Sequence, residues 1–64
     1  MGDEMNNAEL IKFSVEEFSR LQTYMKAVDT DSNAYELMKS RYIELKVILQ
    51  ASGVNLSEID TIRA

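Results

Sequence analysis

Apolar residues recur along this chain at spacings of three and four, which is typical of amphipathic helices rather than strands. The first stripe consists of Phe18, Leu21, Met25 and Val28, with Tyr24 at its edge. The second stripe consists of Tyr35, Met38, Tyr42, Leu45 and Leu49. The chain has no proline and only two glycines, and so few helix-breaking residues favour long helices. We therefore predict an all-α fold.

The first helix is predicted over 14–28. Ser14 is followed three residues later by Glu17, which matches the capping box, a pair of side chains that bond the free N–H groups at a helix start. The segment 8–13 allows two interpretations. Either the helix starts earlier and Leu10 and Ile11 extend its stripe, or the segment is extended and packs against the helix start.

The second helix is predicted over 33–52. The preceding turn offers Asp31, Ser32 and Asn33 as N-caps. Gly53 is the expected left-handed stop, and Val54 beyond it is placed to make the hydrophobic contact that accompanies such a stop.

A short third helix is predicted over about 56–62, with Asn55 and Ser57 as candidate caps and apolar residues at every third position. Two long helices joined by a short polar turn must lie antiparallel. The predicted architecture is thus an antiparallel helical hairpin with a short C-terminal helix, and two such hairpins can pair into a four-helix bundle. Residues 1–7 are expected to be a disordered polar tail, and 8–64 a single small domain.

Composition narrows the chemistry that the chain can perform. It has 64 residues, no cysteine and no histidine, so disulfides, thiolate metal sites and the commonest general base are excluded. The net charge of −4 argues against partners with phosphate backbones and against anionic membrane surfaces. The acidic N-terminus does not resemble a signal peptide, and a cytoplasmic location is expected.

Two apolar residues of the second helix lie far from its main stripe, which Leu37 and Ile48 widen on one side. On a helical wheel, Ile43 and Val47 fall on the face that should meet solvent. Three interpretations are open: the third helix or the N-terminal segment covers them, they form a self-association or partner surface, or they are simply exposed. We take Ile43 and Val47 as the candidate interface.

No residue pattern indicates a catalytic, metal or cofactor site. The series Asp29-x-Asp31-x-Asn33 resembles the opening of a calcium loop, but that loop requires glycine at its sixth position and glutamate at its twelfth. Ala34 and Ser40 occupy those positions. We expect a capped turn there, with no metal and no cofactor.

These observations predict a non-catalytic module that binds a protein partner or a second copy of itself through apolar helix surface. The alternative is a phospho-regulatory hairpin with an enzyme-like action on a signalling protein. That alternative rests on size and shape alone.

Overall fold

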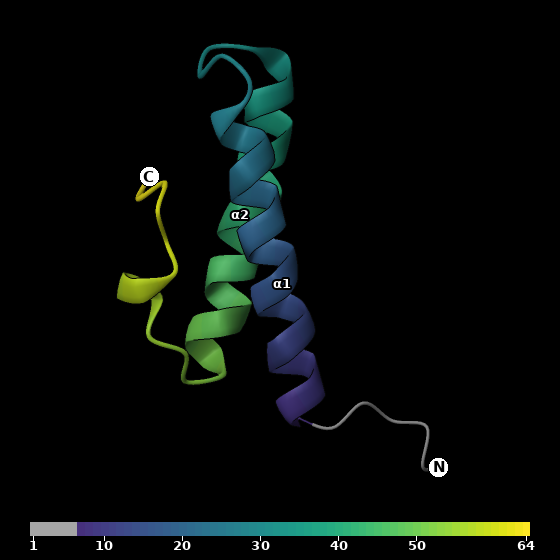
Figure 1. The fold of residues 1–64 in the computed structure, drawn as a ribbon, viewed down its shortest axis with the longest axis vertical. Coiled ribbons are helices and arrows are strands. Elements are labelled where there is room, and N and C mark those ends of the chain that lie inside the picture. The colour runs from purple at the N-terminus through teal and green to yellow at the C-terminus, as the bar shows by residue number, and fades with distance from the viewer. Residues whose placement is uncertain (1–6) are drawn as a thin grey trace.

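The structure is a computed structural model that describes residues 7–64. It consists of helix α1 (Asn7–Lys26), helix α2 (Asn33–Ala51) and the single 3-10 turn η1 (Leu56–Glu58). The two helices pack antiparallel, and the chain after α2 turns back along that helix (Figure 1). No strand occurs within residues 7–64. The prediction of an all-α antiparallel hairpin is confirmed.

The core lies between the two helices, where their predicted stripes meet. Phe18 of α1 and Tyr42 of α2 stack with ring centroids 5.4 Å apart and an interplanar angle of 8°. Such aromatic pairs contribute about 0.5–1.5 kcal/mol beyond the burial of their area. The other fully buried apolar side chains are Met25, Leu45 and Leu49.

Helix α1 begins seven residues before the predicted start, so the capping-box interpretation of Ser14 is wrong. Ser14 is a buried residue in the middle of α1, 7% exposed. Glu17 does not reach back toward it, because both of its carboxylate oxygens accept hydrogen bonds from Arg41. Of the two interpretations of 8–13, the structure has the helical one. The helix also ends at Lys26, two residues earlier than predicted.

Helix α2 starts and stops where local signals place its ends. Ser32 is the N-cap, and its hydroxyl accepts a hydrogen bond of 3.1 Å from the N–H of Tyr35. At the other end Gly53 has φ +86°, and its N–H donates to the carbonyl of Gln50. The N–H of Val54 donates to the carbonyl of Leu49, which completes a Schellman stop. Val54 packs against the core, as predicted.

The predicted third helix over 56–62 is much shorter in the structure. Only η1 is helical, and residues 59–64 are irregular. The physical reason lies in α1: the side chain of Gln22 bonds the carbonyl of Ile59 and the N–H groups of Thr61 and Ile62. Backbone groups that a helix would use are therefore bonded to α1.

The predicted tail 1–7 lies almost wholly outside the described residues, and Asn7 is the first residue of α1. Within residues 7–64, no helix combines the length and the apolar character that a membrane span requires.

Candidate interaction surface

Several large apolar side chains are exposed on the two helices. Seven are at least 36% exposed: Leu10, Phe13, Tyr24, Leu37, Ile43, Val47 and Ile48. Single apolar residues on a protein surface are ordinary, whereas grouped ones mark binding sites. Whether these seven residues are scattered or grouped on the hairpin therefore decides whether they indicate a binding site.

A charged cluster joins α1 to α2 across one side of the hairpin. Nε of Arg41 donates a 2.8 Å hydrogen bond to Glu17, and a second nitrogen of the same guanidinium donates to the other carboxylate oxygen at 3.1 Å. Arg41 also bonds Glu44 at 3.1 Å. These side chains are 43–65% exposed, so the pair contributes little to stability. The cluster does show which sides of the two helices lie next to each other.

The contacts within this cluster favour the charged forms of Glu17 and Arg41. The hydrogen bond from Arg41 lowers the pKa of the Glu17 carboxyl below its usual range, and the positive charge of Arg20 acts in the same direction. The same hydrogen bonds raise the pKa of Arg41.

Five of the seven exposed apolar residues share a side with this cluster. Residues three, four or seven positions apart lie on one face of a helix. Counted from Glu17 and Arg41, those spacings select a set that we call the bridge face. It comprises Leu10, Phe13, Glu17 and Tyr24 on α1, and Leu37, Arg41, Glu44 and Ile48 on α2.

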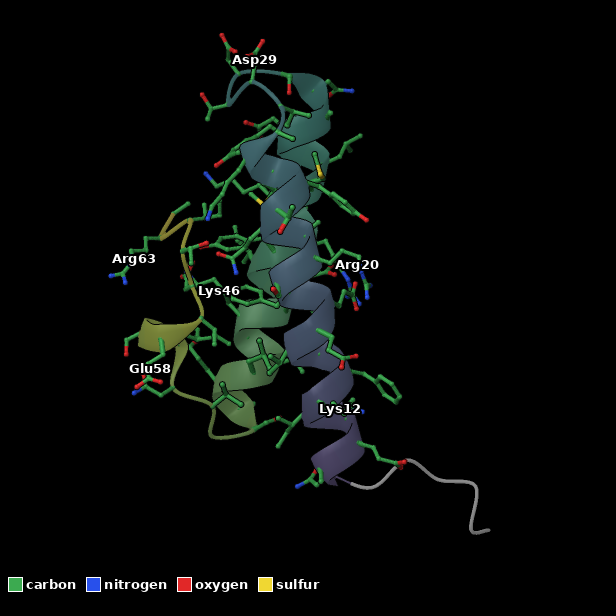
Figure 2. The ribbon with its side chains drawn as sticks, viewed as in Figure 1. Lys12, Arg20, Asp29, Lys46, Glu58 and Arg63 are labelled. Carbon is green, nitrogen blue, oxygen red and sulfur yellow. The ribbon has the colours of Figure 1, made fainter. Side chains whose placement is uncertain are left out.

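The bridge face therefore has apolar residues at both ends and charges in the middle. A hollow of about 230 Å³ is open on it, lined by Glu17, Arg20, Leu21 and Tyr24. Figure 2 shows Arg20 on the side of the hairpin away from Glu58 and Arg63, which lie on the C-terminal segment, residues 52–64.

The predicted interface residues lie on a separate stripe of α2. Ile43 is 48% exposed and Val47 is 62% exposed. Ile43 is five residues from Ile48, about 140° around the helix, so it is not part of the bridge face. The expectation that another segment covers these two residues is wrong for residues 7–64. Their role as an interface stays a prediction.

The C-terminal segment covers a different flank of the hairpin. It is fixed by Gln22, which is 3% exposed and whose side-chain nitrogen donates to the carbonyl of Ile59 at 2.9 Å. The amide oxygen of Gln22 accepts from the backbone N–H groups of Thr61 and Ile62, and from the Thr61 hydroxyl. One side chain of α1 thus satisfies four polar groups of a segment nearly forty residues away.

Asp60 is the second anchor of this segment and is 7% exposed. Its Oδ1 accepts hydrogen bonds from the Tyr42 hydroxyl at 2.6 Å and from the N–H of Arg63 at 2.8 Å. Its Oδ2 lies 3.2 Å from Nζ of Lys46, which also lies 5.0 Å from the centre of the Tyr42 ring. Burial alone would raise the pKa of Asp60, but these donors hold it below its usual range.

Asp60, Tyr42 and Lys46 shift the pKa values of one another through their contacts. Burial, together with the hydrogen bond to Asp60, raises the pKa of Tyr42. The Asp60 carboxylate raises the pKa of Lys46 despite the burial of the ammonium group. Every buried polar side-chain atom in residues 7–64 has a partner. The arrangement is therefore that of a structural clasp, which fixes the C-terminal segment to the hairpin.

Metal-ligating residues do not gather anywhere in the described part of the chain. No group of three or more aspartate, glutamate, histidine or cysteine residues is close enough to hold an ion within residues 7–64. The carboxylates of Asp29 and Asp31 lie in the interhelical turn, where the hydroxyl of Ser32 donates a 2.7 Å hydrogen bond to the carbonyl of Asp29.

Comparison of the chain with known proteins found no matching family model, no matching curated protein and no matching solved structure.

The periodicity of α2 indicates only one of the two exposed apolar surfaces, that of Ile43 and Val47. The helical wheel assigns Leu37 and Ile48 to a widened α2 stripe, whereas they are 68% and 36% exposed. The signal for the bridge face is the spacing of Phe13, Glu17 and Tyr24, which becomes readable only once α1 is known to begin at Asn7. Neither Gln22 nor Asp60 carries a recognisable signal.

Proposed function

We propose that the chain is a non-catalytic protein–protein interaction module that acts by burying apolar helix surface against a partner. The observation that carries this proposal is the exposure of seven large apolar side chains, five of them on the bridge face. Mixed surfaces of this kind, with aromatic and aliphatic residues around arginine, have the composition of binding interfaces.

The proposal is also supported by where the polar groups of the chain are used. Two of the three buried polar residues within 7–64, Gln22 and Asp60, bond the C-terminal segment to the hairpin. They leave the bridge face and the stripe of Ile43 and Val47 exposed to solvent, where a partner could bind. The negative net charge supports a protein partner over nucleic acid or an anionic membrane, and the proposed location is the cytoplasm.

Site-specific photocrosslinking tests the proposal for a partner of any identity. Phe13, Ile43 and Thr23 are replaced, one at a time, by p-benzoylphenylalanine in cells that express the chain. Phe13 represents the bridge face and Ile43 the predicted interface. Thr23 is the matched control, since it is exposed on α1 and its hydroxyl bonds only the carbonyl of Ser19 one turn earlier.

We expect discrete crosslinked proteins from Phe13 or Ile43 and none of them from Thr23. Crosslinks that are equal at all three positions, or absent from all three, would contradict the proposal. Turnover of a phosphoprotein by substoichiometric amounts of the purified chain would replace it with the phospho-regulatory alternative.

A further inference from the structure

We infer that the partner of the bridge face is a second copy of this chain, packed face to face about a two-fold axis parallel to the helices. This inference rests on the proposed function and specifies the partner. The product is a four-helix bundle in which every neighbouring pair of helices is antiparallel.

The direction of the axis follows from the charges. With the axis parallel to the helices, α1 of each copy lies over α2 of the other, and Glu17 faces Arg41 of the second copy. With the axis across the helices, α1 lies over α1, and Glu17 faces its own equivalent. Like charges in direct opposition destabilise an interface, whereas opposite charges fix its register. The Glu17–Arg41 bridge is therefore self-complementary in only the first arrangement.

The apolar residues fit the same arrangement. Tyr24 and Leu37 lie toward the interhelical turn, and Phe13 and Ile48 lie toward the open end of the hairpin. With the axis parallel to the helices, ends of the same kind meet, so Tyr24 packs on Leu37 of the second copy and Phe13 packs on Ile48 of the second copy. Apolar groups thus meet apolar groups on both sides of the charged centre.

At the bridge face two acidic chains can approach each other with little charge repulsion. Its charges balance, since Glu17 and Glu44 are matched by Arg41 and the adjacent Arg20. The net charge of −4 therefore belongs to the rest of the chain.

The size of the face sets the strength of the dimer. The 20 residues of α1 make it about 30 Å long, and two packed helices make it about 20 Å wide. Two such faces together bury on the order of 1,200 Å², the lower limit for a stable complex. We therefore expect a dimer that dissociates on dilution.

Sedimentation equilibrium from about 10 µM to about 1 mM gives the first test, since this range covers weak dimers. We expect the mass to rise from the 7.3 kDa of one chain to twice that value. Ile48→Glu should weaken the dimer by at least about a hundredfold, because symmetry places the new carboxylate in the interface twice. Ile43→Glu is the matched control, with the same change on the same helix, and should leave the dimer intact.

Charge reversal tests the central pair. Glu17→Arg and Arg41→Glu should each be monomeric alone, because each variant opposes like charges. An equimolar mixture should restore a complex of twice the chain mass. Both variants keep the buried core, so circular dichroism should show folded hairpins in each. A dimer that survives both reversals unchanged would overturn the proposed register.

The axis itself is tested by one spin label, because the chain has no cysteine of its own. Thr30→Cys places the label in the exposed interhelical turn. The proposed axis brings the two turns to the same end, so the label-to-label distance should fall well below the 43 Å long dimension of the chain. A distance near or above that dimension would overturn the proposed axis.

The outcomes separate this inference from the proposed function. A chain that stays monomeric at the highest concentration, while Phe13 crosslinks to a different protein, overturns the homodimer and leaves the interaction module standing. A dimer that is lost with Ile43→Glu and kept with Ile48→Glu overturns the bridge face as the interface and moves it to the predicted stripe. A chain that stays monomeric and forms no crosslink in cells overturns the proposed function as well.

Discussion

The hydroxyl of Tyr42 donates a 2.6 Å hydrogen bond to Oδ1 of Asp60, eighteen residues further along the chain. The ring of Tyr42 is fully buried against Phe18, and Asp60 is 7% exposed. The same hydroxyl accepts a 3.1 Å hydrogen bond from the N–H of Ala64. A core residue of α2 thereby holds the end of the C-terminal segment against the hairpin.

Removal of that hydroxyl should destabilise the fold. Tyr42→Phe keeps the ring and its stack on Phe18, but Asp60 loses one donor and the N–H of Ala64 loses its acceptor. A hydrogen bond to a charged group contributes about 1.5–3 kcal/mol to stability. We expect the free energy of unfolding in urea to fall by that amount. Tyr24→Phe is the control: this ring is 53% exposed, and its change should stay within about 0.5 kcal/mol. Equal losses in the two variants would contradict the clasp.

Acid should weaken the same contact. The pKa of Asp60 is lower in the folded chain than its usual value, because the bonds from Tyr42, Arg63 and Lys46 outweigh the effect of burial. The unfolded chain therefore binds this proton more readily, and stability should fall as the pH drops below about 4. Urea unfolding at a series of pH values checks this. Asp60→Asn should be less stable at neutral pH, and its deficit relative to the wild type should shrink in acid. A deficit that does not change with pH would show that Asp60 does not titrate in this way.

Alkali should weaken the fold for the opposite reason. Burial and the bond to Asp60 raise the pKa of Tyr42, so the unfolded chain loses this proton first. The contribution of Tyr42 to the free energy of unfolding is therefore complete below about pH 10 and should decline as the pH rises above about 10. Urea unfolding across this range should show a smaller decline for Tyr42→Phe than for Tyr24→Phe. Identical alkaline profiles in the two variants would exclude Tyr42 as the source.

Gln22 should control the attachment of the C-terminal segment. Gln22→Ala leaves the carbonyl of Ile59 and the N–H groups of Thr61 and Ile62 without their partner. We expect hydrogen exchange at the amides of Thr61 and Ile62 to accelerate by at least about tenfold, since each lost bond contributes roughly 1 kcal/mol. Exchange in the middle of α2 should change much less. Gln50→Ala, the same substitution at an exposed position, is the control and should leave both amides protected. Unaltered protection in Gln22→Ala would rule out this role.

The parts of the fold that the sequence predicts are those with local causes. Ser32 and Gly53 delimit α2 through bonds to groups within five residues of themselves, so their roles are readable from the sequence. The start of α1 is mispredicted because Ser14 and Glu17 match a capping box by spacing alone, whereas Glu17 bonds Arg41, 24 residues away. The third helix is overestimated because Gln22 bonds the backbone at Ile59. The second error comes from a tertiary contact that no local pattern encodes, whereas the earlier start of α1 is one of two interpretations that the local pattern leaves open.

The candidate surfaces divide in the same way. The position of Ile43 and Val47 on the side of α2 away from its core stripe follows from the periodicity of one helix, and a helical wheel is enough to predict it; that no other segment within 7–64 covers them is known only from the structure. The bridge face combines residues from two helices, so it depends on how α1 and α2 are rotated against each other. The Glu17–Arg41 contact shows how the two helices are rotated against each other. A wheel of a single helix does not contain this information.

Gly53 provides a final test, in which conformation and packing are separable. Its φ of +86° lies in the left-handed region, and a Cβ added there meets no atom within 4 Å. Gly53→Ala should therefore lose about 1–2 kcal/mol through backbone strain alone. Gly53→Asn should lose less, because asparagine tolerates this region better than alanine while having a larger side chain. The midpoint of urea unfolding for the two variants measures the order. If the asparagine variant is the less stable of the two, crowding rather than backbone conformation governs the choice of residue at this position.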